Sequence, residues 1–393
     1  SLLGRRPLLL AAAAVSAAAS PPGADQGDDQ GREAGGGQGQ QALPPGSGIV
    51  IVRPRDPRVG GGRHRRRSAR LKESGTGVRK SSVTAHATRP GPPSSSYRKA
   101  IQANIDGEGP GTLGTREAKM KICGACERTL PDDSYSEEQR GRRQSIRRCD
   151  ECVAAGNQLV LMRKGRKRSE EDECPICNLP LPLDVKQTSF RSCCMKEVCN
   201  GCTLAAFKRG MRDCPFCRTT ALTDGSQCLP MIQKRADSGD PVAIYHLGNK
   251  YHLGQYGLEK DTTRAVELYE HAAELGEKDA HYNLGCLYDE GVDVEKNTPK
   301  AIRHWEAAAM LGHVSARFNL GNEEGRAGNV DLALQHWLIS ANLGHGISLD
   351  NVKKMFMSGL TAKADYARAL RGYQSATEEM SSPDRNEAKA LRS

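Results

Sequence analysis

The residues in this sequence best suited to chemistry are cysteines, and eight of them lie between positions 174 and 217. They occur as Cys174-Pro-Ile-Cys177, the doublet Cys193-Cys194, the pair Cys199 and Cys202, and Cys214-Pro-Phe-Cys217. Too few apolar side chains lie between them to form a packed core, so another source of stability is needed. Cysteine pairs separated by two intervening residues are common ligands of tetrahedral zinc. The segment therefore predicts two zinc sites.

The order of these cysteines resembles the RING finger family, as do Cys-Pro-x-Cys at both ends and Arg218 directly after the last cysteine. RING fingers hold two zinc ions in a cross-brace, in which the first and third ligand pairs share one ion and the second and fourth pairs share the other. The resemblance, which covers about an eighth of the chain, implies two ligand sets. They are Cys174, Cys177, Cys199 and Cys202 for the first zinc, and Cys193, Cys194, Cys214 and Cys217 for the second.

One position departs from the family pattern. Most RING fingers have a histidine three residues before the fifth ligand, where this sequence has Lys196, and no histidine lies between Cys174 and Cys217. The all-cysteine variant of the family is therefore the better match. Adjacent ligands on one tetrahedral ion are sterically awkward, so either Cys193 or Cys194 is alternatively a spectator. We predict that both bind zinc.

The resemblance also implies an activity. RING fingers recruit a ubiquitin-conjugating enzyme through a shallow apolar groove, and Ile176 and Pro215 match contact positions in the two Cys-Pro-x-Cys turns. Arg218 matches the linchpin cation, which holds the ubiquitin thioester in a conformer open to lysine attack. Such catalysis works by positioning and has no nucleophile of its own. The alternative is a structural zinc knot that serves only protein contacts.

A smaller cysteine unit precedes this segment. Cys123, Cys126, Cys149 and Cys152 form two C-x2-C pairs with the spacing of a one-zinc ribbon. The unit resembles the short four-cysteine fingers of some heterochromatin adaptor proteins. Its basic residues either contact phosphates or form a merely soluble loop; they are Arg140, Arg142, Arg143, Arg147 and Arg148.

The chain beyond Thr220 contains an internal repeat of about 36 residues, marked by recurring Leu-Gly pairs. Each unit predicts two helices, with Asp240-Pro241 and Thr298-Pro299 as starts and Gly276 as an end. Trp305 and Trp337 occupy matching places, which predicts core positions. The pattern resembles the Sel1-like repeats, relatives of the tetratricopeptide repeat, and implies an all-α solenoid that acts as an adaptor. The histidines show no metal-binding spacing.

Composition divides the chain into an amino-terminal tail and folded modules. Residues 1–115 are rich in Gly, Pro, Ser and Arg, lack a regular period and predict disorder. Leu2 to Ser20 has the shape of a signal or transit peptide, with an alanine-rich disordered tail as the alternative, and is too short for a membrane span. Cysteines in metal-ligand spacing favour a reducing compartment, hence a cytoplasmic or nuclear location.

These observations predict a multidomain protein. Its parts are a disordered basic tail at 1–115, a four-cysteine zinc finger at 118–156, a RING-type zinc finger at 170–221 and helical repeats at 227–380. The predicted function is that of a RING-type ubiquitin ligase, with a ubiquitin-conjugating enzyme and a protein substrate or adaptor as partners. The alternative is a non-catalytic zinc scaffold. The net charge of +10 leaves nucleic-acid binding as a third hypothesis.

Overall fold

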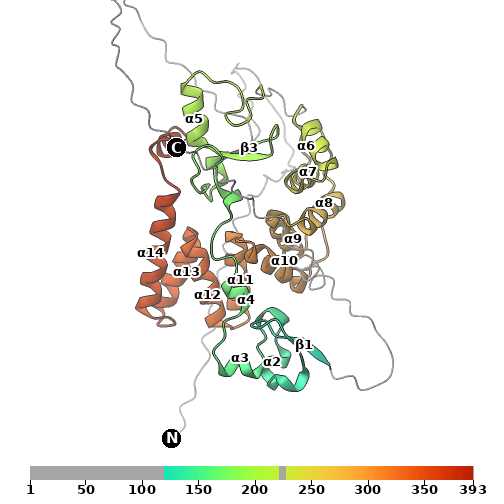
Figure 1. The fold of residues 1–393 in the computed structure, drawn as a ribbon, viewed down its shortest axis with the longest axis vertical. Coiled ribbons are helices and arrows are strands. Elements are labelled where there is room, and N and C mark those ends of the chain that lie inside the picture. The colour runs from blue at the N-terminus through green and yellow to red at the C-terminus, as the bar shows by residue number, and fades with distance from the viewer. Residues whose placement is uncertain (1–118, 221–226, 393) are drawn as a thin grey trace, which may run out of the picture. The chain divides into compact units, whose positions relative to one another are not determined.

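The computed structural model describes residues 119–220 and 227–392, all of which fall within one compact unit of the chain (Figure 1). We call residues 119–156 the finger, 157–169 the connecting segment, 170–220 the RING-like module and 227–392 the repeat module. The predicted tail at 1–115, with its candidate targeting peptide, lies outside the described residues.

The finger is built from a short hairpin and two short helices. Strands β1 (Met120–Ile122) and β2 (Thr129–Pro131) pair antiparallel, with Lys121 opposite Leu130. Helices α2 (Glu137–Gly141) and α3 (Asp150–Ala154) follow. The Tyr135 side chain is buried beneath the hairpin, and its hydroxyl donates to the carbonyl of Lys121 at 2.8 Å. This one aromatic residue anchors the hairpin because the finger has little other apolar surface to bury.

The RING-like module likewise has a small apolar core. Its hairpin consists of β3 (Thr188–Arg191) and β4 (Lys196–Cys199), which pair antiparallel, and α5 (Asn200–Lys208) follows directly. Its own buried apolar cluster contains Leu181 and Val198 besides two of the cysteines. A core of this size is too small to hold the module together, as the sequence predicted.

The repeat module consists of helices, most of which pack on their neighbours in the sequence. They are α6 (Cys228–Asp237), α7 (Pro241–Leu253), α8 (Thr262–Glu274), α9 (Lys278–Glu290), α10 (Thr298–Met310), α11 (Val314–Arg326), α12 (Val330–Asn342), α13 (Gly346–Met357), α14 (Lys363–Glu379) and α15 (Pro383–Ala390). Nothing in the sequence had predicted α15, which lies beyond the expected end of the repeats at 380. None of the helices in the described residues combines the length and apolar character needed to cross a bilayer.

The predicted helix boundaries are largely confirmed. The Asp240 side chain accepts hydrogen bonds from the backbone of Val242 and Ala243, with Pro241 at the first turn. Gly276 follows the end of α8 with φ of +94°. Helix α10 begins at Thr298, but the prediction that Thr298 caps it was wrong by one residue, because Asn297 is the N-cap and its side chain accepts from the amide of Lys300.

In the Leu-Gly pairs that lie within α7, α9 and α11, the glycine receives an aromatic ring from the next helix. Gly248 faces Tyr269, Gly285 faces Trp305, and Gly321 faces Trp337. A Cβ atom placed on Gly321 would lie 2.5 Å from the indole nitrogen of Trp337, well inside van der Waals contact. The repeated glycine therefore permits close approach of the paired helices. This contact supports the prediction that both tryptophans are core residues.

We expect Gly285→Ala to destabilise the repeat module by about 1–3 kcal/mol, because the new methyl group would overlap the buried Trp305 ring. Hydrogen exchange of the amides in α9 and α10 measures this change. Gly346→Ala is the matched control, since a Cβ atom there would meet the Tyr373 hydroxyl at an ordinary 3.7 Å. Equal protection in both variants would contradict the packing argument.

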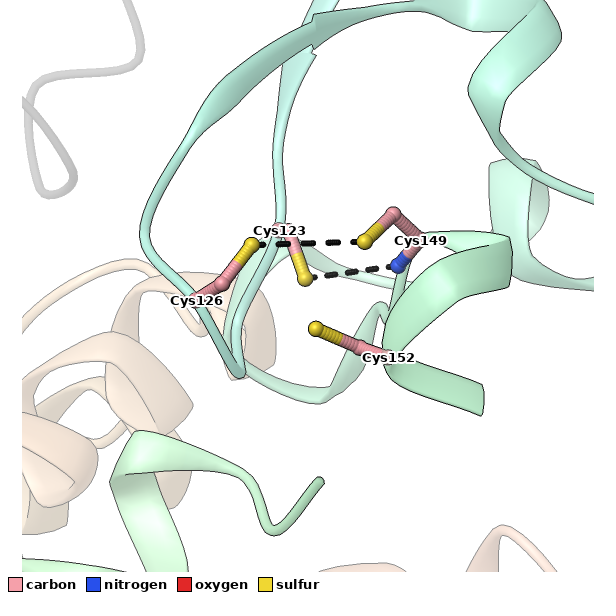
Figure 2. Close-up of side chains that lie close together, drawn as sticks. All are labelled: Cys123, Cys126, Cys149 and Cys152. Carbon is pink, nitrogen blue, oxygen red and sulfur yellow. Dashed lines mark hydrogen bonds between the residues drawn. The ribbon is translucent and has the colours of Figure 1, made fainter. Parts of the chain in front are cut away.

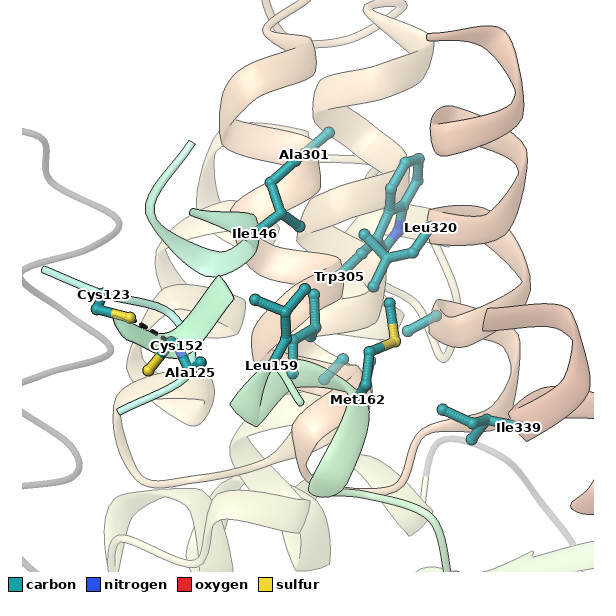
Figure 3. Packing of buried hydrophobic residues seen from close by; sticks show 14 of the residues in the cluster. Cys123, Ala125, Ile146, Cys152, Leu159, Met162, Ala301, Trp305, Leu320 and Ile339 are labelled. Carbon is teal, nitrogen blue, oxygen red and sulfur yellow. Dashed lines mark hydrogen bonds between the residues drawn. The ribbon is translucent and has the colours of Figure 1, made fainter. Parts of the chain in front are cut away.

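The connecting segment packs on the repeat module. It contains α4 (Val160–Arg163), which Leu159 precedes as the N-cap. Leu159 and Met162 lie in one buried cluster with Trp305 and Leu320 (Figure 3). Gly165 then has φ of +60° and runs so close to the carbonyl of Ala309 that a side chain there would collide with it. The finger and the repeats therefore share a core, which the sequence did not predict.

Candidate metal centres

The Cys123, Cys174 and Cys214 turns have the same backbone geometry. In each, the amide of the first cysteine donates to the carbonyl five residues later, and its carbonyl accepts from the amide four residues later, at 2.8–3.0 Å. The residue after the second cysteine has φ between 53° and 64°, and these residues are Glu127, Asn178 and Arg218. These hydrogen bonds turn the two cysteine side chains of each pair toward one point.

The finger cluster comprises Cys123, Cys126, Cys149 and Cys152 (Figure 2). The first two lie on the turn between β1 and β2, while Cys149 caps α3 and Cys152 lies within it. The Cys123 sulfur accepts from the amide of Cys149 at 3.3 Å, as Figure 2 shows. Burial by itself would raise the pKa of Cys126, but hydrogen bonds from Arg128 lower it to about 6. These donors stabilise a thiolate form.

The first cluster of the RING-like module comprises Cys174, Cys177, Cys199 and Cys202. Cys199 caps α5, and its sulfur accepts from the amide of Cys202 at 3.4 Å. A hydrogen bond from Cys199 lowers the pKa of Cys174 to about 4, while the pKa of Cys199 is raised in return. Cys174 is thus the member of the cluster favoured as a thiolate, whereas burial raises the pKa of Cys202.

The second cluster of the RING-like module comprises Cys193, Cys194, Cys214 and Cys217. The first two lie on the turn between β3 and β4, where Met195 takes a φ of 53°. The sulfurs of Cys194 and Cys214 are 4.0 Å apart, and those of Cys193 and Cys217 are 3.4 Å apart. The structure therefore brings both members of the doublet to the same centre.

The donor sets fit zinc. The four sulfurs of each cluster lie within 4.8 Å of one another. Tetrahedral zinc with bonds of about 2.3 Å separates its sulfur ligands by about 3.8 Å. Sulfur pairs in the three clusters lie on both sides of this value: 4.0 Å for Cys126 with Cys149, 3.9 Å for Cys177 with Cys199 and 3.4 Å for Cys193 with Cys217. The first and second clusters also alternate along the sequence, as a cross-brace requires. Each cluster could therefore hold one metal ion, and four thiolates favour zinc among common metals.

The residues predicted to contact a conjugating enzyme are accessible. Ile176 is 39% exposed, and Phe216, next to Pro215, is 43% exposed, so each Cys-Pro-x-Cys turn presents an apolar side chain to solvent. Arg218 is also exposed, and its guanidinium lies 2.8 Å from the Met211 sulfur. Its φ of 64° follows from its place at the end of the turn.

The finger arginines mostly face other residues of this chain. Arg140 donates to the carbonyl of Tyr135, and Arg147 donates to the carbonyls of Gln139 and Arg142. Such contacts hold the loop in shape. They favour a structural role for these side chains over the phosphate contacts considered from the sequence.

Arg143 makes the strongest of these contacts. It pairs with two carboxylates of the repeat module. Its Nε lies 2.7 Å from the Glu306 carboxylate, and a terminal nitrogen pairs with Glu324. Ser145 adds a hydrogen bond to Glu306, and Asn329 adds one to Glu324. Both carboxylates are buried, so this cation neutralises charges that would otherwise lie in the core. Sequence reasoning missed this pairing, although a glutamate in the apolar run around Trp305 was a detectable signal.

The histidines form no metal centre within the described ranges 119–220 and 227–392, where the metal-like groups are the cysteine clusters. His281 and His304 are buried with their Nδ1 atoms 3.1 Å apart. Burial lowers the pKa of His281 to about 4, so it is neutral at physiological pH.

Residues 241–277, 278–313 and 314–345 match the Sel1 repeat family and are three Sel1 repeats. The predicted repeat type is thereby confirmed for this part of the chain, including the third unit. The matched residues do not include the cysteine clusters, so the RING assignment stays a prediction. A comparison with curated proteins finds no match.

Several solved structures are similar to part of the chain. A Sel1 repeat protein from Oxalobacter formigenes is 24% identical, with 46% of this chain and 72% of that chain covered and a TM-score of 0.37. A protective antigen of uropathogenic Escherichia coli with an SLR fold is 21% identical, with 46% and 38% covered and a TM-score of 0.36. The immunity protein Pa5087 from Pseudomonas aeruginosa is 21% identical, with 54% and 70% covered and a TM-score of 0.30.

Proposed function

We propose that this protein is a zinc-dependent, RING-type ubiquitin ligase built on a Sel1-repeat scaffold. The RING-like module recruits a ubiquitin-conjugating enzyme, and the repeats bind a protein substrate or adaptor. The observation that carries the proposal is the pair of interleaved cysteine clusters whose turns present Ile176 and Arg218 to solvent. The protein works in the cytoplasm or nucleus, where its thiols stay reduced.

The roles of the proposed residues follow from their chemistry. Ile176 supplies apolar contact to the conjugating enzyme, with Pro215 and Phe216 on the other turn. Arg218 donates hydrogen bonds from a fixed backbone position, so it restrains the ubiquitin thioester without reacting itself. Zinc bound by the cysteine clusters would fix the orientation of these turns. The side chains of the clusters take no part in the transfer.

The test is ubiquitin transfer by the full chain with a panel of conjugating enzymes. We expect Ile176→Ala and Arg218→Asn each to lower the rate of ubiquitin-chain formation at least about tenfold, which corresponds to about 1.4 kcal/mol. Asparagine is chosen at 218 because it tolerates positive φ, so the turn is kept while the cation is removed. Zinc content is measured on the same samples.

Matched controls separate these roles from general surface changes. Val185 is 79% exposed in the same module, so Val185→Ala removes an apolar side chain elsewhere. Arg209→Asn removes an exposed cation at the end of α5. Both controls should keep wild-type transfer. A zinc-loaded wild-type chain that discharges ubiquitin from no enzyme in the panel would refute the ligase proposal.

A non-catalytic zinc scaffold is the second candidate. It is favoured by the shared core of the finger, the connecting segment and the repeats. In this case the cysteine clusters fix the shape of a binding surface, and neither Ile176 nor Arg218 matters. Partner binding that survives both substitutions, with no transfer by the wild type, would favour the scaffold.

A further inference from the structure

The carboxyl-terminal helix α15 packs on α5 of the RING-like module. Their backbones meet at Gly201, where a Cβ atom would lie 2.7 Å from the amide nitrogen of Arg385. An ion pair at 2.5 Å joins Lys208 at the end of α5 to Glu387. Arg392 donates to the carbonyl of Lys186 at 2.6 Å. Helix α15 and Arg392 therefore contact the RING-like module along α5 and at the Lys186 carbonyl.

Arg385 is the centre of this contact and is only 5% exposed. One terminal nitrogen donates to the carbonyls of Pro180 at 2.6 Å and Met380 at 2.7 Å. The other donates to the Cys177 sulfur at 3.3 Å and to the carbonyl of Leu179 at 3.2 Å. A single guanidinium on α15 thus links the Cys177 sulfur, the residues that follow it and the end of α14.

The charges favour this arrangement. Four thiolates around a zinc dication carry a net charge of about −2, and such a centre is stabilised by hydrogen-bond donors to sulfur. A guanidinium presents its donors in a rigid fork, so it can hold the sulfur and the adjacent carbonyls at the same time. Within the described residues, Arg385 is the cationic side chain that donates to the Cys177 sulfur.

We propose that Arg385 is a positioning residue for the first metal site, so that the carboxyl-terminal helix completes a centre whose cysteines lie about 200 residues earlier. It orients the Cys177 turn and offsets charge on its sulfur. Loss of α15 therefore loosens the first cluster and leaves the second cluster and the finger cluster intact. The proposal rests on zinc at these cysteines and not on ligase activity.

The test measures each cysteine separately in the full chain. Four zinc-loaded proteins are treated with a chelator and an alkylating reagent. They are the wild type, Arg385→Met, Arg385→Lys and a chain ending at Met380. Peptide mass spectrometry then gives the labelling rate of every cysteine. We expect Arg385→Met and the shortened chain to label the first cluster about tenfold faster, within the range for supporting residues of metal ligands. Arg385→Lys should restore part of the protection.

The other clusters serve as internal references. Labelling of the second cluster and the finger cluster should match wild type in every variant. Arg371→Met is the control variant, because it removes an exposed arginine from neighbouring α14, and all of its labelling rates should match wild type. Unchanged first-cluster rates in Arg385→Met would overturn the proposal, as would equal acceleration at all three clusters, which indicates general unfolding. A wild-type chain without zinc would overturn the metal assignment itself, and this inference with it.

Discussion

Removal of metal should unfold the cysteine-rich half of the described chain and leave the Sel1 repeats helical. Structural zinc contributes about 10–16 kcal/mol of apparent binding free energy in small fingers, and this energy is folding energy where no other core exists. Besides its cysteines, the RING-like module buries few apolar side chains among its described residues, and these are Leu181, Met195, Val198 and Leu204. We expect about three zinc ions per chain, one for each cluster, and their loss to excess chelator.

Hydrogen exchange resolves the outcome by segment. Amides of β3, β4 and α5 should exchange freely without metal, while those of α7 to α9 keep their protection. Cys149→Ser, Cys199→Ser and Cys214→Ser should each lower the zinc content by about one ion. Cys286→Ser is the control, because this thiol lies outside the clusters. Full protection of the RING-like module in a metal-free chain would contradict the zinc interpretation.

Local features of the sequence predicted the repeats and the cysteine turns. The Leu-Gly pair within the first helix of each repeat recurs because its glycine must admit an aromatic ring, as Gly321 admits Trp337. The C-x2-C turns at Cys123, Cys174 and Cys214 close through backbone hydrogen bonds within six residues, so their geometry needs no distant partner. Patterns of this kind are short-range, and they can be read from the chain alone.

Contacts between modules could not be predicted in the same way. Arg143 and Glu306 are paired across more than a hundred residues, and nothing near either position specifies the other. Arg385 reaches the Cys177 turn from a helix that the sequence did not predict. The one available signal was a charge in an apolar run, because a buried glutamate such as Glu306 requires a partner.

Replacement of Arg143 should be the most damaging change outside the clusters. Arg143→Met keeps most of the side-chain volume but leaves Glu306 and Glu324 without a cation, and Glu324 is only 1% exposed. Removing one partner of a buried ion pair costs about 3–5 kcal/mol, because the remaining charge loses its compensation. We expect a loss of this size in the opening free energy of α10 and α11 amides, measured by hydrogen exchange.

The cause can be separated from simple loss of an arginine. Arg142 pairs with the exposed Glu138, so Arg142→Met should cost less than about 1 kcal/mol. Combining Arg143→Met with Glu306→Gln and Glu324→Gln removes the uncompensated charges and should recover much of the loss. If Arg143→Met and Arg142→Met had equal effects, the paired carboxylates would not anchor the finger. A recovery in the triple variant would identify this ion pair as the contact that fixes the finger on the Sel1 repeats.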